Sequence, residues 1–354
     1  MTTSIQEKYN IEDKNCFDFL RVIFCLIIIL SHLYELSQCE KLKFLSFFFN
    51  IGIFGLQAFF IISGFLVAKS YQRTSTLKKY FIKRAKRLFP AYIFLLLVTV
   101  VGLSFFTKYN LVDYFTNTEV YKYLAWNAIF LNFMHPCLPG IFENNLLCAV
   151  NGSLWTLKVE ESFYIFLPFI FYLIQKTKKA ATIIILIYFL SLLYWYVMDD
   201  LFNQPLLAKQ MPGYLSFFAV GIFLNLNLKW VLKFKKILFF GAMISLLLTY
   251  FFYFQINVLF PAALGLLIII VAYSFPFFNN FGKHGDFTYG LYIYHFPIIQ
   301  LFSQYDLFNR YNAVAMGTVV IIITFLFAAF SWFFIERGFL DRYKKRTKLI
   351  PAEC

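Results

Sequence analysis

The sequence has little charge, and its acids are outnumbered by its bases. Only 14% of its 354 residues are charged, whereas an average soluble protein carries about 25%. There are 18 acidic and 32 basic residues, which gives a formal net charge of +14. The cations stand in short blocks between apolar runs and form no basic face, which excludes a nucleic-acid-binding module. The positive-inside bias of membrane proteins explains these blocks.

Other missing features exclude further classes. The cysteines show no metal-ligand spacing, so no metal site is expected. No internal repeat or low-complexity linker divides the chain, and no small-residue cleavage site follows the first apolar run. We therefore expect one transmembrane domain over residues 17–335, between a cytoplasmic segment, 1–16, and a basic cytoplasmic tail, 336–354.

What the sequence does have is apolar length: 61% of its residues are hydrophobic and 50 are Phe. A helix that crosses a bilayer needs about 20 apolar residues. Ten runs approach this length and predict an all-α, polytopic integral membrane protein. They are Phe17–Ser37, Ser46–Ala68, Leu88–Thr107, Ser153–Ile174, Ala180–Met198, Pro212–Leu228, Ile237–Phe254, Ile256–Phe275, Asp286–Ser303 and Asn312–Ile335.

An eleventh run, Tyr123–His135, is shorter than a crossing and is typical of a re-entrant or interfacial segment. Counting it as a crossing would put more Lys and Arg outside than inside. Ten crossings with both termini in the cytoplasm keep most of the cations inside, in agreement with the positive-inside rule.

Arg21 and His32 lie within the first apolar run. Ionisable residues in a membrane helix are costly, so they indicate functional sites. Eleven residues at about 100° each bring both side chains to one helix face, about 16 Å apart along the axis.

Two further groups of ionisable residues stand at or within membrane runs. Arg84 and Arg87 end a block of eight cations without acids between Lys69 and Arg87, and they precede Pro90, which fits the first turn of a helix better than its middle. Two guanidinium groups there suit a phosphorylated ligand. Glu160 lies in the fourth run without a sequence-local partner, and we expect it to face His32.

Five motifs occur together in a fixed order. They are Asp18-x-x-Arg21 with His32 eleven residues later; Gly55–Leu66, which reads GLQAFFIISGFL; Arg84-x-x-Arg87-x-x-Pro90-x-Tyr92; Ser153-Leu154-Trp155 followed by Glu160-x-x-Phe163-Tyr164; and Thr288–Pro297, which reads TYGLYIYHFP. With these motifs the chain resembles the acyltransferase 3 family of bacterial membrane O-acyltransferases from residue 15 to about residue 340.

This resemblance implies an O-acetyltransferase of the bacterial inner membrane. Members typically move an acetyl group from cytoplasmic acetyl-CoA to hydroxyls of cell-surface glycans such as O-antigen, capsule or exopolysaccharide. The expected partners are a glycan or lipid-linked glycan and the membrane lipids. The acceptor, the size of the acyl group and the oligomeric state stay open.

A mechanistic hypothesis assigns roles to seven residues. His32 is the general base or a transient acyl carrier, and Glu160 orients its ring. Arg84 and Arg87 hold the CoA phosphates, and Arg21 steadies the pantetheine arm or the remaining phosphate charge. Trp155 and Tyr164 are assigned to the acceptor. His295, within the last motif, is interpreted as a buried histidine hydrogen-bonded to a neighbouring helix, with a second base as the alternative.

Two functions from other classes compete with this one. A transporter or flippase for a glycan or lipid-linked intermediate would also place polar residues in a bundle of ten helices. A membrane sensor or assembly factor with a degenerate site is the other alternative. Finally, Cys137 and Cys148 fall on the predicted outer side, where an oxidising periplasm permits a disulfide.

Overall fold

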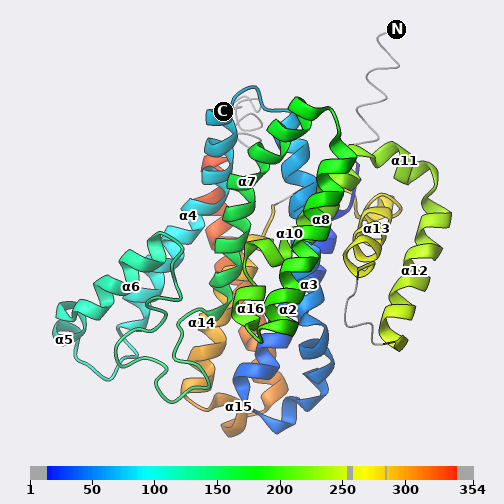
Figure 1. Cartoon of the computed structure of the whole chain (residues 1–354). Coiled ribbons are helices and arrows are strands. Elements are labelled where there is room, and N and C mark those ends of the chain that lie inside the picture. Colours follow the sequence, from blue (N-terminus) through cyan, green and yellow to red (C-terminus); the bar gives the residue numbers. More distant parts are fainter. Residues whose placement is uncertain (1–13, 253–257, 284, 341–354) are drawn as a thin grey trace, which may run out of the picture. The chain divides into compact units, whose positions relative to one another are not determined.

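The computed structural model describes residues 14–252, 258–283 and 285–340. Within these ranges the chain is all-helical, and Cys137 and Ala149 form an isolated β-bridge. The predicted all-α class is therefore confirmed (Figure 1). The predicted segment 1–16 and tail 336–354 lie mostly outside the described residues.

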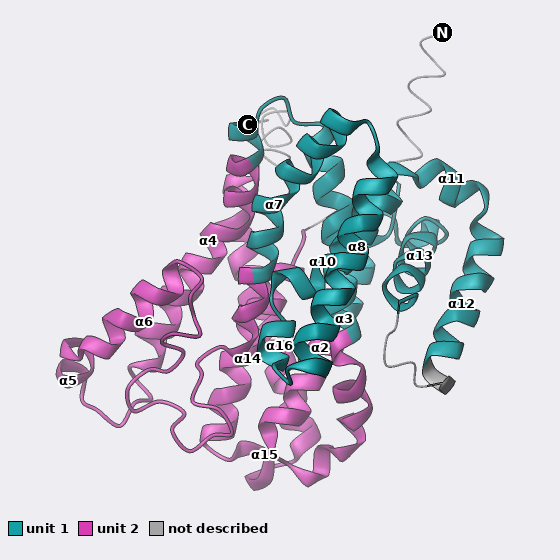
Figure 2. Ribbon diagram, viewed as in Figure 1, with its two compact units in different colours: residues 1–24, 54–80, 159–284 teal, residues 25–53, 81–158, 285–354 magenta. Residues whose placement is uncertain are grey.

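The chain divides into two compact units, each assembled from three separate stretches of sequence (Figure 2). Unit 1 comprises residues 1–24, 54–80 and 159–284, and unit 2 comprises residues 25–53, 81–158 and 285–354.

Unit 1 is built around a buried helix, α10. The helices of this unit, some of which begin or end in unit 2, are α3 (Ser46–Gln72), α7 (Trp155–Thr177), α8 (Ala180–Tyr196), α9 (Pro205–Ala208), α10 (Met211–Leu226), α11 (Leu228–Lys233), α12 (Lys235–Phe252) and α13 (Phe260–Ala272), with a π-helical turn at Val197–Leu201. Helix α10 packs on α8 and α13. It is apolar on all sides, which is the pattern of a buried helix.

Glycines let α3 and α10 approach each other closely. A Cβ atom on Gly64 would collide with the Phe218 backbone, and one on Gly221 would collide with the Ile61 backbone. Small residues at such crossings are typical of membrane helix pairs. Ser63, which neighbours Gly64, donates a hydrogen bond to Glu160 of α7.

Unit 2 contains most of α2 (Phe17–Ser37) and of α4 (Leu77–Leu103), each of which begins in unit 1. Its other elements are the 3-10 turn η1 (Glu40–Leu45), α5 (Leu111–Thr116), α6 (Thr118–Ala128), η2 (Gly152–Leu154), α14 (Thr288–Gln304), α15 (Leu307–Arg310), α16 (Ala313–Phe330) and the π-helical segment η6 (Ser331–Glu336). Helix α14 packs on α16, where Gly290 meets Ala328. On α2, Leu33 and Leu36 share one core cluster with Phe296 and Ile299 of α14.

Each of the ten predicted runs contains an α-helix. The run Phe17–Ser37 coincides with α2, and each of the other nine differs from its helix at one end or both. The largest difference is in α4, which begins at Leu77 and keeps Pro90 in its interior, so the expectation that Pro90 lies in a first turn is wrong. Proline costs a helix one backbone hydrogen bond, and helix continues on both sides of it here. Arg84 and Arg87 therefore lie one turn apart within a helix. The runs Ile237–Phe254 and Ile256–Phe275 each extend partly into residues 253–257, outside the described part.

Six helical stretches of the described chain are long and apolar enough to cross a bilayer. They are Phe17–Ser37, Glu40–Gln72, Leu77–Leu103, Ala180–Leu201, Pro205–Leu226 and Ala313–Phe339. A seventh is formed if α13 and the segment Pro276–Lys283, which meet at 75°, make one broken span. The short run Tyr123–His135 is helical only as far as Ala128, the end of α6.

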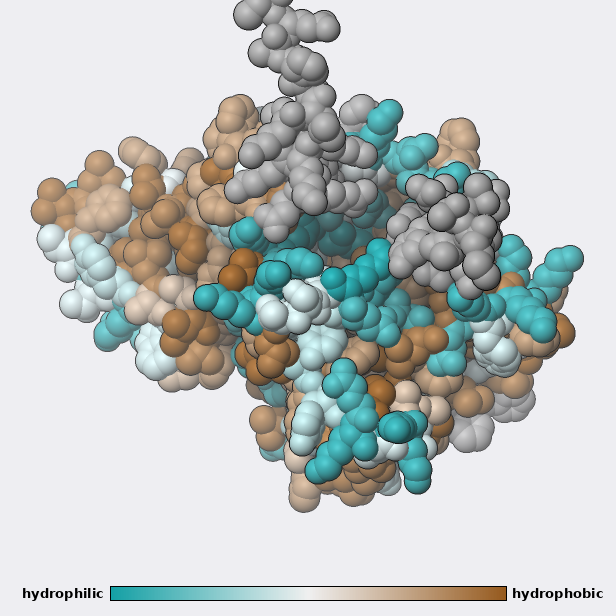
Figure 3. All heavy atoms as spheres, turned by 90° about the horizontal axis from the view of Figure 1, so that it is seen from above, coloured by the Kyte–Doolittle hydropathy of each residue, from teal (hydrophilic) through white to brown (hydrophobic). Residues whose placement is uncertain are grey.

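Many large apolar side chains remain exposed on these helices. Leu186 and Leu190 of α8 are 55% and 54% exposed, and Phe240 of α12 is 66% exposed. Figure 3 shows such apolar residues, in brown, on the face it draws. Runs of exposed apolar residues on long helices are suited to lipid contact, and the chain is a multi-pass membrane protein.

Candidate active site

His32 of α2 forms a hydrogen bond with a second histidine, His295 of α14. Nδ1 of His32 lies 2.8 Å from Nε2 of His295, and the two ring planes differ by only 8°. The ring centroids are 5.1 Å apart, about as far as they can be with the nitrogens this close, so the rings meet edge to edge in one plane and do not overlap. The interpretation of His295 as a buried histidine bonded to a neighbouring helix is confirmed.

The surroundings of this pair are well packed. His295 is 0% exposed, and its Nδ1 lies 3.1 Å from the backbone carbonyl oxygen of Leu291, one turn earlier in α14. The rings of Phe296 and His32 meet at 74°, with their centroids 5.3 Å apart. His32 itself is only partly buried, and no described residue hydrogen-bonds to its Nε2.

The segment before α7 holds α14 in place. Asn151 donates its side-chain amide to the carbonyl of Ile293 at 2.7 Å, and the hydroxyls of Thr156 and Tyr292 are 2.6 Å apart. A Cβ atom on Gly152 would collide with the Phe296 ring. The Asn151-Gly152 turn is therefore shaped to fit against the histidine-bearing helix.

Arg87 of α4 lies between two carboxylates. Its guanidinium is 2.6 Å from Asp286, just before α14, and 3.6 Å from Glu336 at the end of η6. Glu336 is 2% exposed and also accepts a hydrogen bond from Ser331 at 3.0 Å. The guanidinium lies 5.8 Å from the centre of the Tyr289 ring, whose hydroxyl donates to the carbonyl of Leu88. Arg87 thus joins the first turn of α14 and the end of η6 to α4, and two acids offset its charge.

Arg84 lies one turn before Arg87 on α4 and is partly exposed. The cations around it, from Lys78 to Lys86, stand on the same helix. Both arginines lie within α4, although the predicted run began only at Leu88. Arg87 is held by Asp286 and Glu336.

In unit 1, Glu160 of α7 accepts two hydroxyl hydrogen bonds. Ser63 of α3 donates to Oε1 at 3.2 Å, and Tyr164, one turn later on α7, donates to the same oxygen. The expectation that Glu160 has no sequence-local partner is therefore wrong: a residue four positions on is a helix neighbour. Tyr164 is 5% exposed and its backbone carbonyl accepts from Tyr80, so it lies in a packed setting.

Arg21 and Trp155 are the two remaining residues of the predicted site. Arg21 lies 3.9 Å from Asp18, one turn earlier in α2, within unit 1. Trp155 is the first residue of α7, directly after η2, and is partly exposed in unit 2. Among the described residues, no group of three His, Cys, Asp or Glu side chains is arranged to hold a metal ion.

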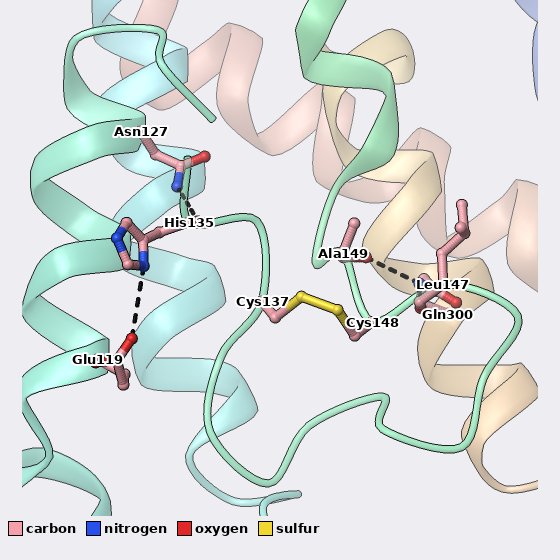
Figure 4. The surroundings of a disulfide bond; sticks show 8 residues. All are labelled: Glu119, Asn127, His135, Cys137, Leu147, Cys148, Ala149 and Gln300. Carbon is pink, nitrogen blue, oxygen red and sulfur yellow. Dashed lines mark hydrogen bonds and ion pairs between the residues drawn. A yellow bond between two sulfur atoms is a disulfide. The ribbon is translucent and has the colours of Figure 1, made fainter. Parts of the chain in front are cut away.

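The long segment between α6 and η2 is fastened at several points (Figure 4). Cys137 and Cys148 form a disulfide, as the sequence permitted. The Gln300 side chain of α14 donates to the carbonyls of Leu147 and Ala149, at 2.6 and 2.8 Å. The Cys137–Cys148 loop is therefore tied to the same helix that carries His295.

A second cluster lies along α6. His135 lies 3.5 Å from Glu119, and its backbone carbonyl accepts from Asn127 (Figure 4). A hydrogen bond from Lys122, together with the charges of Lys122 and His135, holds the pKa of the exposed Glu119 carboxyl below its ordinary value.

Three contacts of the predicted site residues were not predicted from the sequence. They are the contact of His295 with His32 and those of Asp286 and Glu336 with Arg87. The available signal was weak. Asp286 and Glu336 stand at the ends of apolar runs, where a carboxylate also fits a solvated helix end. Nothing in the sequence indicates that both ends meet at Arg87.

The fold and these polar clusters define a class: a multi-pass helical membrane protein with a hydrogen-bonded histidine pair, of which His295 is buried and His32 is partly buried. A family model described as an acyltransferase domain matches residues 14–336. The chain belongs to this family, the acyltransferase 3 family, and is an acyltransferase.

Three curated relatives illustrate the family. The chain is 26% identical over 347 residues to an O-acetyl transferase of Shigella phage Sf6, covering 95% of this chain and 99% of the relative. It is 26% identical over 366 residues to Nodulation protein 10 of Rhizobium leguminosarum bv. viciae, covering 95% of each. It is 26% identical over 340 residues to the peptidoglycan O-acetyltransferase OatA of Listeria monocytogenes, covering 83% of this chain and 53% of OatA. No solved structure matches the chain.

Proposed function

We propose that the protein transfers an acetyl group from cytoplasmic acetyl-CoA to a hydroxyl of a cell-surface glycan or lipid-linked glycan, in the inner membrane of a bacterium. Family membership over residues 14–336 and the O-acetyltransferase names of two relatives support this reaction. The observation that carries it is His32, a partly exposed imidazole with one nitrogen held by a buried partner on α14.

The proposed topology has ten crossings and both termini in the cytoplasm. The cation block of α4 is then cytoplasmic, and the Cys137–Cys148 loop is periplasmic, where a disulfide is chemically stable. Each of the ten runs contains a helix, which supports this count. The domain boundaries 17–335 remain part of the same proposal.

The proposed reaction has one proton to move. His32 takes the proton of the acceptor hydroxyl as its oxygen attacks the thioester carbon; the carbon–sulfur bond breaks and the proton passes to the CoA thiolate. A positioned base accelerates such a step by about 10² to 10⁴-fold. A transient acetyl group on His32 is the variant of this scheme in which the imidazole itself attacks.

The other residues are proposed to bind and orient. Arg84, with neighbouring cations of α4, holds the CoA phosphates, and Arg21 steadies the pantetheine arm. Arg87 was predicted to bind phosphate as well, but its contacts with Asp286 and Glu336 favour a role in holding α14 and η6 on α4. Glu160 is proposed to act on the reaction through its carboxylate, which accepts hydrogen bonds from two hydroxyl groups. Trp155 and Tyr164 are proposed to bind the acceptor.

The test compares surface glycans from cells that produce the wild-type protein, His32→Ala or His135→Ala. Mass spectrometry should find the acetyl ester with the wild type and with His135→Ala, and lose it with His32→Ala at equal protein levels in the membrane. Full acetylation by His32→Ala would contradict the assignment. A transporter instead predicts loss of exported glycan, with no CoA thiol released from acetyl-CoA by the purified protein.

A further inference from the structure

Both ring nitrogens of His295 are committed to partners inside the protein. Nδ1 faces the carbonyl oxygen of Leu291 at 3.1 Å, and Nε2 faces Nδ1 of His32 at 2.8 Å. The side chain is 0% exposed. His295 therefore has no nitrogen left for a substrate, which argues against the alternative that it is a second base.

The partners also define where the protons lie. A carbonyl oxygen can only accept, so the proton of neutral His295 lies on Nδ1, and its Nε2 carries a lone pair. That lone pair can accept only if His32 supplies a proton from Nδ1. Neutral His32 then has its own lone pair on Nε2, the nitrogen that no described residue hydrogen-bonds.

We propose that His295 is a positioning residue that fixes His32 in the tautomer protonated at Nδ1, so that Nε2 is the atom that takes the proton of the acceptor hydroxyl. The hydrogen-bond chain runs from His32 through His295 to the Leu291 carbonyl. When Nε2 gains the proton, His32 becomes an imidazolium whose Nδ1–H still donates to His295. The proton on Nε2 then passes to the CoA thiolate, and the starting tautomer is restored.

The packing around α14 holds the hydrogen-bonded residues His32, His295 and Leu291 in position. Asn151 holds the Ile293 carbonyl, Gly290 lies directly against Ala328 of α16, and Phe296 packs on the His32 ring. The His32 ring is therefore held by a neutral residue with one available lone pair, where a serine protease uses a buried aspartate for the same orienting purpose. The inference rests on the proposed function for its chemical consequence, but the tautomer itself can be measured without catalysis.

The first test is nitrogen-15 NMR of the histidine rings in the full-length protein in lipid nanodiscs. The chain has only four histidines, so a His32→Gln spectrum identifies the signals of His32 by their loss. At alkaline pH, where imidazoles are neutral, we expect His32 to show a protonated Nδ1 and an unprotonated Nε2. In His295→Leu we expect a mixture of both tautomers. A proton on Nε2 of His32 in the wild type, or an unchanged His32 spectrum in His295→Leu, would overturn the proposal.

The second test uses a matched pair of amides. The amide oxygen of Gln reaches close to the position of a histidine Nε2 and can accept from His32, whereas the shorter side chain of Asn cannot reach it. We expect His295→Gln to keep kcat within about 10-fold of the wild type and His295→Asn to lose about 10²-fold, with KM for acetyl-CoA unchanged in both. Thermal unfolding of both variants controls for packing. Equal loss in Gln and Asn, or full activity in His295→Leu, would contradict the proposal.

Failure of the proposed function and failure of the positioning role of His295 give different experimental results. If His32→Ala retained acetyl transfer, the role of His32 in the proposed function would be wrong, whatever the NMR result. If His32→Ala were inactive but the tautomer were independent of residue 295, only the positioning role of His295 would fail.

Discussion

Unit 2 contains two polar clusters that differ in how completely their members are satisfied. Around Arg87, one cation meets Asp286 and the buried Glu336, and Ser331 donates to the latter as well. Around His32, two imidazole rings share one hydrogen bond, and Nε2 of His32 has no partner among the described residues. The arrangement around Arg87 is suited to holding helices together, whereas the arrangement around His32 leaves one ring nitrogen, Nε2, available. The difference teaches that an ionisable group in a membrane helix indicates function only after its partners are known.

The largest effect expected from this comparison is on stability, at Arg87. Arg87→Gln leaves Glu336, which is 2% exposed, without its cation, and removing one partner of a buried ion pair costs about 3–5 kcal/mol. We expect a markedly lower thermal unfolding temperature in detergent and little folded protein in the membrane.

The control for Arg87 is the double variant Arg87→Gln with Glu336→Gln, which removes both charges of that pair. It should recover part of the lost stability, because the more deeply buried carboxylate, Glu336, is no longer charged, although Asp286 still loses its contact with Arg87. If Arg87→Gln unfolded like the wild type but failed to bind CoA, Arg87 would be a phosphate ligand and the contrast between the clusters would be wrong.

A smaller loss of stability is expected when the Cys137–Cys148 disulfide is removed, because this bond also stabilises the folded chain. Replacing Cys137 and Cys148 together by Ser opens the loop between them, and a native disulfide typically contributes about 2–4 kcal/mol. We expect a lower unfolding temperature with KM for acetyl-CoA unchanged, since the loop is proposed to lie on the periplasmic side. A change in that KM without a loss of stability would show that the loop acts on the donor site.

The sequence predicted the helices better than it predicted the partners of the polar residues. Long apolar runs predict membrane helices because a span needs a fixed apolar length. Each of the ten runs contains an α-helix, and six or seven helical stretches of the described chain are long and apolar enough to cross a bilayer. Pro90 was misplaced because proline marks a helix start only on average, and the amphipathic stretch from Leu77 already forms helix before it.

The partners were harder because they come from distant parts of the chain. His32 and His295 are 263 residues apart, and Arg87 and Asp286 are 199 apart. Periodicity gives the face of a helix but not the neighbour on that face. The local partner of Glu160 is different: Tyr164 stands four residues on, and the helical spacing alone could have indicated it.

The smallest expected effect distinguishes Arg84 from Arg87, its neighbour one turn away. Arg84 is partly exposed among the cations of α4, so Arg84→Gln removes one charge of several from the proposed phosphate site. We expect KM for acetyl-CoA to rise about 10-fold, or about 1.4 kcal/mol, with kcat near that of the wild type. Arg84→Lys keeps the charge but not the forked guanidinium, so its KM for acetyl-CoA should fall between those of the wild type and Arg84→Gln. Titration with CoA, followed by thermal shift, measures the same difference without turnover. If Arg84→Gln left CoA binding unchanged, the phosphate site would have to lie elsewhere than on this turn of α4, because Arg87 is already matched by two acids.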